Sequence, residues 1–316
     1  MPGFDLRSLG VPIVQAGMGA VARHELAAAV SQAGGLGTIA GARARIAAEV
    51  DGARALSGRP IAVNLLLPFL RPGDVDAAAT ADVIVTFWGE PRRLAANMWI
   101  HQCGSVEEAR AAEAAGVDAV IAQGVEAGGH VRGTTPLLEL LERVRAAVKI
   151  PVLAAGGIVD AVGVREVLDA GAVAAVVGTR FLASEESRAH PDYKQRCVAG
   201  TETVLTELFG LGWPNAPHRV IPNQATRRWL RGDARGPGWI RAANRFVAPL
   251  TTRVPDSLQG RAIKAQRASR PFLGPQPPTD DGPASLVESG PLYAGVNVGR
   301  IADVRPAAEL VRALTP

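Results

Sequence analysis

The fold is decided by two stretches of the sequence, Val152-Leu153-Ala154-Ala155-Gly156-Gly157-Ile158 and Val173-Ala174-Ala175-Val176-Val177-Gly178-Thr179-Arg180. Each stretch starts as a short run of aliphatic residues, which is typical of a buried β-strand, and then turns at glycine. The same pattern of an apolar run followed by turn residues occurs six more times before them, at residues 13–14, 36–39, 61–64, 83–87, 99–102 and 119–122. The chain therefore contains eight predicted strands, the last two at residues 152–154 and 173–177.

Alanine-rich amphipathic stretches lie between most of these strands and are predicted to be helices. They cover residues 24–33, 46–56, 106–115, 137–148 and 162–170. Gly34, Gly116 and Gly171 stand where glycine commonly ends a helix, and Ser105 forms a capping box with Glu108. Strict alternation of strands and helices predicts an all-parallel sheet covered by helices, an α/β fold of the (β/α)8 TIM-barrel type. The third and fourth strand–helix units are the least regular. Proline and glycine interrupt residues 68–81 after the third strand, and only residues 92–97 remain for a helix after the fourth.

The glycine turns after the seventh and eighth predicted strands point to a phosphate-bearing ligand. A (β/α)8 barrel commonly binds phosphate in these two loops. Glycine lets backbone N–H groups approach the phosphate oxygens, and a helix N-terminus adds a favourable dipole. The expected phosphate site therefore lies at Gly156, Gly157, Gly178 and Thr179.

Length and composition predict a soluble enzyme that contains more than a barrel. The chain has 316 residues, 47% of them hydrophobic and 20% charged, whereas a barrel of this type takes roughly 250 residues. We expect the barrel in residues 1–200 and a basic, mainly helical extension in residues 201–316, with a Pro-rich loop near residues 271–283.

Targeting signals and cysteine chemistry are not evident in the sequence. No uncharged run is long and apolar enough to span a bilayer, and the N-terminus lacks the basic start and apolar core of a signal peptide, so the expected location is the cytoplasm. Cys103 and Cys197 form neither a disulfide framework nor a metal cluster. We expect both thiols to be reduced and no metal to be bound.

The extension carries most of the positive charge. Residues 219–270 contain eleven arginines and one lysine against two aspartates, a net charge of +10, while the whole chain has +4. A basic stretch with Trp229, Trp239 and Phe246 can bind nucleic acid or an acidic membrane surface. No nucleic-acid-binding motif accompanies the charge, so we favour a solvated face of a helical extension whose aromatic residues pack on the barrel. Neither nucleic acid nor membrane is an expected partner.

A glycine motif at the N-terminus suggests a different fold and has to be weighed. Residues 17–22, Gly-Met-Gly-Ala-Val-Ala, match the G-x-G-x-x-A pattern of a dinucleotide-binding Rossmann fold. That fold places an acidic residue after its second strand to bind the ribose, and residues 39–43 contain none. Eight strand–helix units favour the barrel, in which residues 15–19 form the first loop at the catalytic end.

The clearest chemical signal is His130. It ends a glycine-rich loop, residues 122–130, which follows the sixth predicted strand. Catalytic groups of this fold lie at the carboxyl ends of the barrel strands, and histidine exchanges protons near neutral pH. We therefore predict that His130 is a general base or binds an anion. The other histidines have weaker contexts, and a structural role is favoured for His24 and His101. No nucleophile elbow or nucleophile beside a base supports covalent hydrolysis.

The order and spacing of several motifs resemble the nitronate monooxygenase family, formerly called 2-nitropropane dioxygenases. The resemblance covers the barrel closely and continues into the extension. It rests on residues 12–18, 33–37, 63–64, 126–130, 155–158, 178–181 and 185–194, then on residues 203–206, Gly212-Trp213-Pro214 and residues 291–295.

The resemblance implies an FMN enzyme in which a smaller, mainly helical domain covers the site of a TIM barrel. Such enzymes oxidise alkyl nitronates with O2: the flavin receives an electron from the nitronate, and the resulting radicals react with oxygen. The histidine that matches His130 deprotonates a neutral nitroalkane or stabilises its anion. Carried over by motif, Gly17, Met18, Asn64, Gln102 and Gln123 line the flavin ring and ribityl chain, and the phosphate contacts Gly156, Gly157, Gly178 and Thr179. Gly128 is a further expected cofactor-binding residue. Homo-oligomers are possible.

The family also includes different activities, which keeps an alternative open. Some flavoproteins of this shape use NAD(P)H to reduce enoyl thioesters, as enoyl-ACP reductases do, or quinones. Gln102 stands where several relatives carry lysine, and the bulky Trp88 can reshape the substrate pocket. For a reductase, the arginine-rich extension can contact phosphates of the nucleotide or the carrier. A basic binding protein with the barrel as scaffold is a further alternative.

Overall fold

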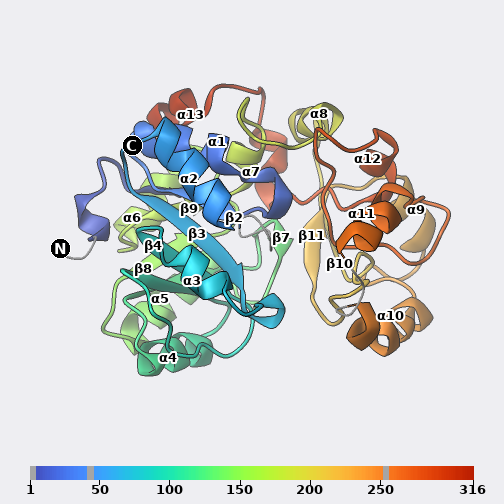
Figure 1. Ribbon diagram of the computed structural model, residues 1–316, viewed down its shortest axis with the longest axis horizontal. Helices are drawn as coiled ribbons and strands as arrows, with labels where there is room; N and C mark the ends of the chain where they lie inside the picture. The colour runs from blue at the N-terminus through green and yellow to red at the C-terminus, as the bar shows by residue number, and fades with distance from the viewer. Residues whose placement is uncertain (1–4, 41–45, 252–255) are drawn as a thin grey trace.

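Eight parallel strands form the larger lobe of the computed structural model, which describes residues 5–40, 46–251 and 256–316 (Figure 1). These strands are β1 (Ile13–Gln15), β2 (Gly37–Ala40), β3 (Ile61–Leu66), β4 (Val83–Phe87), β5 (Trp99–Cys103), β6 (Ala119–Gln123), β8 (Val152–Ala155) and β9 (Ala175–Val177). They are ordered β1-β9-β8-β6-β5-β4-β3-β2. Leu36, just before β2, exchanges backbone hydrogen bonds with Ile13 and Gln15 of β1, both at 2.9 Å. This contact closes the sheet into a barrel.

The predicted barrel is confirmed, with helices outside the sheet. They are α1 (His24–Gln32), α2 (Ile46–Leu56), α3 (Asp74–Ala78), α4 (Val106–Ala115), α5 (Leu137–Ala147), α6 (Ala161–Asp169) and α7 (Thr179–Leu182). The side chain of Ser105 accepts a hydrogen bond from Glu108 N at the start of α4, as the capping motif predicts, while the Glu108 carboxylate accepts from Gly104 N. The irregular fourth unit has no helix: residues 92–97, the only ones that remained for one, connect β4 to β5 without a helix. Six residues behind Pro91 are too few to bury an amphipathic face.

Buried apolar residues fill both sides of the sheet. One cluster fills the barrel interior with side chains from alternate positions of the strands. It includes Val85, Ile121, Leu153 and Val176. A second cluster lies between the strands and the surrounding helices. Continuous burial on both faces explains why these strands appear in the sequence as unbroken apolar runs.

The chain ends back on the barrel. Helix α13 (Ala307–Leu314) packs against α1 and α6, and it contributes Leu310, Val311 and Leu314 to the cluster outside the sheet. Figure 1 shows the C-terminus on the barrel lobe. The final helix therefore covers the barrel between the first and the last strand–helix units.

The second lobe is joined to the barrel by a small antiparallel sheet. The second lobe contains the helices α8 (Pro191–Ala199), α9 (Gln224–Trp229), α10 (Gly238–Thr251), α11 (Asp256–Lys264) and α12 (Ser285–Ser289). Its strands are β10 (Val204–Thr206) and β11 (His218–Val220). Strand β11 pairs with β10 and also with β7 (Gly129–His130), which belongs to the loop after β6. In this register His218 lies opposite His130. The extension therefore holds the backbone of the glycine-rich loop.

The arginines and aromatic residues of the extension differ in their surroundings. Arg235 pairs with the buried carboxylate of Glu207 at 2.5 Å. Helix α10 buries Ile240 and leaves Trp239 56% and Phe246 82% exposed. The expectation that the aromatic residues pack on the barrel is therefore wrong for Trp239 and Phe246, because they lie on the outer face of α10. No helix in the described ranges is both long and apolar enough to cross a membrane.

Candidate functional site

The carboxyl ends of the barrel strands bring the predicted site residues to one end of the barrel. Asn64 in β3 and Gln102 in β5 are partly exposed, although most residues of these strands are buried. Asn64 also donates to the Val85 carbonyl at 3.3 Å. A Cβ atom on Gly17 would lie 2.5 Å from the Cβ of Asn64, so only glycine allows the loop after β1 to approach β3 this closely. Gly17 and Met18 therefore lie at the same end of the barrel as Asn64.

The glycine turns after β8 and β9 converge on the chain near Gly295. Gly156 and Gly157 have φ angles of +128° and +69°, which other residues rarely adopt. A Cβ atom on Gly295 would lie 3.4 Å from Gly128 N and 3.7 Å from Gly157 N. The Thr179 hydroxyl accepts a hydrogen bond from Gly295 N at 3.0 Å. The structure thus brings together four segments that are distant in sequence, at Gly128, Gly157, Thr179 and Gly295.

Backbone donors at this point are left available to a ligand. Within the described part of the chain, no protein acceptor is found for the backbone N–H groups of Gly157, Gly178 and Thr179. A side chain on Gly178 would make only ordinary contacts, with Ala16 at 3.7 Å and Met18 at 3.9 Å from its Cβ atom. Several unpaired N–H groups around glycine form an anion-binding arrangement. These residues therefore fit a phosphate group.

His130 lies inside an aromatic cluster that we define as Trp88, His130, Trp213, His218 and Tyr293. Its ring stacks on Trp213 with a centroid distance of 3.8 Å and an interplanar angle of 22°. The Trp88 ring is nearly perpendicular to it at a centroid distance of 5.9 Å, and the centroids of the His218 and Tyr293 rings lie 5.2 and 5.5 Å away. The His130 Nε2 atom is buried without a hydrogen-bond partner among the described residues.

Burial sets the charge of His130. Desolvation, with a smaller contribution from His218, lowers the pKa of His130 well below its ordinary value. Burial therefore favours the neutral form of the ring. A neutral imidazole can accept a proton, although its lowered pKa makes it a weaker base.

Gln123 holds the backbone on both sides of His130. Its amide Nε2 donates to the His130 carbonyl at 3.0 Å, and its Oε1 accepts from Arg132 N at 3.2 Å. The side chain itself is 4% exposed. Gln123 thus fixes the position of the glycine-rich loop in this structure, a role that the sequence pattern did not indicate.

The neighbours of His130 were largely missed by reasoning from the sequence. Trp213 and Tyr293 lie in motifs that count toward the family resemblance, but nothing in their spacing indicates that they contact His130. The ring of His218 is held by two hydrogen bonds: its Nδ1 donates to the Ala216 carbonyl at 2.9 Å, and its Nε2 accepts from Phe209 N at 3.3 Å. Both ring nitrogens are therefore satisfied in the neutral state.

Two buried neutral histidines predict a loss of stability in mild acid. Burial lowers the pKa of His101 and of His218 from 6.5 to about 4. Between these values the unfolded chain binds more protons than the folded protein, so stability falls as the pH falls. From pH 7 to pH 5 we expect the free energy of unfolding to fall by about 2 kcal/mol for each histidine. Urea denaturation across this interval measures it. A constant free energy of unfolding would contradict the prediction, because carboxyl groups titrate mostly below this range.

A second group of polar side chains lies on the helical side of the barrel. His24, Glu25 and Glu49 place possible metal ligands within 4.8 Å of one another. Glu49 accepts from His24 Nδ1 at 2.7 Å and pairs with Arg23, and Glu25 pairs with Arg188 at 3.2 Å. Two arginines therefore already compensate these carboxylates, and we interpret the group as an ion-pair network. That the chain binds no metal remains a prediction.

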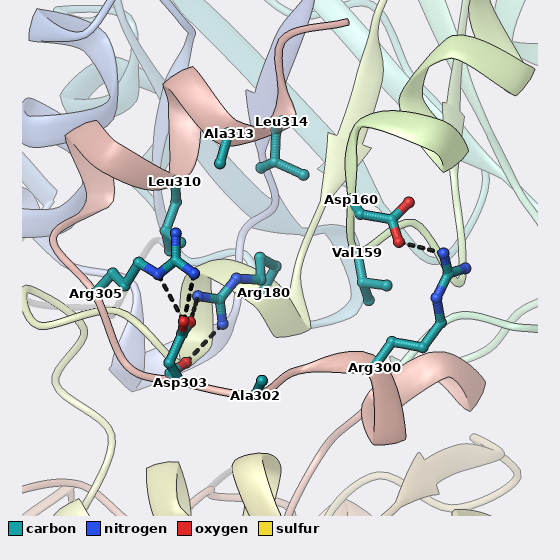
Figure 2. A pocket seen from close by; sticks show the side chains of 10 residues that line it. All are labelled: Val159, Asp160, Arg180, Arg300, Ala302, Asp303, Arg305, Leu310, Ala313 and Leu314. Carbon is teal, nitrogen blue, oxygen red and sulfur yellow. Dashed lines mark hydrogen bonds and ion pairs between the residues drawn. The ribbon is translucent and has the colours of Figure 1, made fainter.

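A cleft of about 170 Å³ opens behind the glycine turns, between them and α13 (Figure 2). Arg180 follows Thr179 directly and is almost fully buried; it donates to the Asp303 carbonyl at 2.8 Å and to its carboxylate at 2.5 Å. Figure 2 shows Arg305 on the same carboxylate, and Arg300 paired with Asp160 across the cleft. Each of these arginines has an acidic partner. The ion pair between Arg180 and Asp303 connects α7 to the final segment of the chain.

Comparison with known proteins gives a consistent result. The nitronate monooxygenase family model matches residues 4–99 and 90–316. The chain is 31% identical to the (3aS,4S,5R,7aS)-5-hydroxy-7a-methyl-1-oxo-octahydro-1H-indene-4-carboxyl-CoA dehydrogenase of Mycobacterium tuberculosis, over 99% of this chain and 94% of that protein. It is 33% identical to a nitronate monooxygenase of Pseudomonas aeruginosa, over 73% of this chain and 82% of the relative. The solved nitroalkane oxidase of Streptomyces ansochromogenes superposes with a TM-score of 0.74 at 32% identity, covering 98% of this chain and 96% of that one.

Proposed function

Because this chain belongs to the nitronate monooxygenase family of flavin-type oxidoreductases, we propose that it oxidises alkyl nitronates with O2 and uses FMN as its flavin. The observation that carries the proposal is the position of His130: its Nε2 atom is buried without a partner among the described residues, and its loop lies beside the glycine turns that fit a phosphate. A proton acceptor near a flavin site suits a substrate whose reactive form is produced by loss of an α-proton.

The backbone donors after β8 and β9 support FMN as the cofactor. In this proposal Gly156, Gly157, Gly178 and Thr179 bind its single phosphate through backbone N–H groups and the Thr179 hydroxyl. Gly17, Met18, Asn64, Gln102, Gln123 and Gly128 line its ring and ribityl chain. The sequence offers no acidic ribose-binding residue of the dinucleotide type, which favours FMN over FAD. When bound, FMN supplies the redox chemistry, since it accepts electrons from the nitronate and passes them to O2.

His130 prepares the substrate in this proposal. With a neutral nitroalkane, the His130 ring accepts the α-proton and leaves the nitronate anion beside the imidazolium. The aromatic cluster excludes water around this ion pair, which strengthens their attraction. Gln123 and the pairing of β7 with β11 keep the ring at one position. A substrate supplied as the nitronate has already lost this proton, so the chain then only has to bind and orient it.

Anaerobic mixing tests the proposed function. Under anaerobic conditions, ethylnitronate is expected to bleach the flavin absorbance of the purified protein, whereas NADH and NADPH bleach it only slowly. With air admitted, nitronate is expected to drive O2 uptake. Fast bleaching by NADH or NADPH together with no nitronate-dependent O2 uptake would reject the proposal.

A reductase that uses NAD(P)H to reduce enoyl thioesters or quinones is the second candidate. It is favoured by one observation: the relative from M. tuberculosis, which aligns with nearly the whole chain, is named for a CoA thioester substrate. The exposed arginines of the extension are chemically suited to phosphate groups of such a substrate. The same mixing experiment separates this candidate from the nitronate oxidase.

A further inference from the structure

Helix α10 carries apolar side chains on two opposite faces. Its inner face places Ile240 in a buried cluster with Leu208 and Phe209. Its outer face carries Trp239 and Phe246, which lie two helical turns apart on the same side and are 56% and 82% exposed. Figure 1 shows α10 at the edge of the second lobe. Because the inner face already anchors the helix, folding does not explain why the outer face is aromatic.

Two arginines accompany these aromatic residues. Arg245 is exposed and precedes Phe246 in α10. The Trp239 ring meets the Trp229 ring at a centroid distance of 6.2 Å, and the exposed Arg228 guanidinium lies over Trp229 at 5.5 Å from the ring centroid. Neither arginine has an ion pair in the part of the chain that the structure describes. We define Arg228, Trp239, Arg245 and Phe246 as the aromatic–basic face.

The charge of the whole chain is polarised toward this face. Residues 219–270 have a net charge of +10 and the complete chain has +4, so the remaining residues have a net charge of −6. A charge distribution of this kind attracts an anionic surface to one side of the molecule and repels it from the other. The aromatic–basic face belongs to the attractive side.

The chemistry of this face favours a membrane over other partners. Duplex DNA keeps its bases inside the stack, so protruding aromatic rings gain little from it. A second copy that met this face on a two-fold axis would bring uncompensated arginines close to arginines. At a membrane interface, by contrast, aromatic rings enter the boundary between head groups and acyl chains, while arginines bind anionic head groups. Both halves of the face therefore find a partner there.

We propose that the aromatic–basic face docks on the surface of a membrane that contains anionic phospholipids. Trp239 and Phe246 enter the interfacial layer, and Arg228 and Arg245 contact the lipid phosphates. The prediction of a solvated extension assumes that its aromatic residues pack on the barrel, and Trp239 and Phe246 do not. The inference does not depend on the reaction that the barrel catalyses.

Cosedimentation with vesicles tests the inference. The flavin-loaded protein is mixed with vesicles of phosphatidylcholine, either alone or with about 30 mol% phosphatidylglycerol, and the bound fraction gives the affinity. We expect binding to the anionic vesicles at about 0.1 M salt, weaker binding at about 1 M salt, and little binding to phosphatidylcholine alone. Absence of binding to the anionic vesicles would overturn the inference.

Two double variants separate the apolar and the charged parts of the face. Trp239→Ser with Phe246→Ser should lower the affinity for anionic vesicles at least about tenfold, because two rings no longer enter the interface. Arg228→Glu with Arg245→Glu should lower it at least about tenfold through repulsion from the head groups. All four side chains lie outside the buried cluster around Ile240, so both variants are expected to fold.

Matched controls lie on the barrel lobe. Arg110→Glu with Arg143→Glu makes the same change in net charge at exposed positions of α4 and α5, and Leu138→Ser removes an exposed apolar side chain from α5. Each should bind anionic vesicles within about twofold of the wild type, because screened charges act mainly near the bound surface. Equal losses in the controls and in the two double variants would overturn the inference.

Other occupants of the face give different results. Binding of nucleic acid in place of vesicles would overturn the inference in favour of a nucleic-acid surface. Light scattering gives the oligomeric state of each protein. A dimer that dissociates in Trp239→Ser with Phe246→Ser, in a protein that binds no vesicles, would overturn it in favour of a second copy.

Discussion

His130→Asn is expected to keep its flavin and to lose about a hundredfold or more of its turnover with neutral nitroalkanes, which is the usual contribution of a general base. The proposed phosphate contacts lie after β8 and β9 and are unchanged by this substitution. Turnover with preformed nitronate should fall much less, because the α-proton is already gone. O2 uptake with nitroethane and with ethylnitronate measures the two losses.

The control for this prediction is His190→Asn. His190 lies at the start of α8, where its Nδ1 accepts a hydrogen bond from Asp192 N, and asparagine is also a good residue at this position. This variant should retain wild-type turnover with both substrates. Equal losses on nitroethane and ethylnitronate in His130→Asn would show instead that His130 binds the anion or supports the fold. Thermal unfolding shows whether His130 supports the fold. If His130→Asn loses only the stacking on Trp213, its melting temperature should fall modestly, whereas a large fall would show a role in the fold.

The barrel was predictable because its strands are buried on both faces. Burial of this kind requires short, unbroken apolar runs, and runs such as residues 83–87 are visible in the sequence without any knowledge of contacts. The segment before β5 was not predictable in the same way. Residues 92–97 have a composition compatible with a helix, but the chain there simply connects two adjacent strands.

The surroundings of His130 depend on contacts that periodicity does not encode. Trp88 follows β4, Trp213 precedes β11, and Tyr293 lies near the end of the chain. Trp213 and Tyr293 reach His130 through β11, which pairs with the two-residue strand β7 and bridges to Tyr293 at Val220. A strand of two residues is too short to recognise in the sequence. The lowered pKa of His130 follows from this burial, which the residue type alone does not indicate.

The proposed phosphate site leads to the second large effect. Gly178→Glu is expected to give a colourless protein. Its affinity for the flavin should fall at least about a thousandfold. A carboxylate ~4 Å from a phosphate charge is repelled by about 4 kcal/mol at the effective dielectric constant of a protein surface, and this energy corresponds to such a loss. The glutamate side chain would also occupy the space in front of the unpaired N–H groups of Gly178 and Thr179.

Loss of flavin in Gly178→Glu is informative only if the barrel remains folded. A Cβ atom at Gly178 meets Ala16 and Met18 at ordinary contact distances, so the backbone should accept the residue. Gly58→Glu is the matched control, since a Cβ atom there meets nothing within 4 Å, and it should keep a full complement of flavin. Flavin absorbance per protein, with mass spectrometry of the released cofactor, measures both content and identity, and we expect FMN from the wild type. Wild-type flavin content in Gly178→Glu would place the phosphate elsewhere, because a carboxylate and a phosphate cannot share the N–H groups that follow β9.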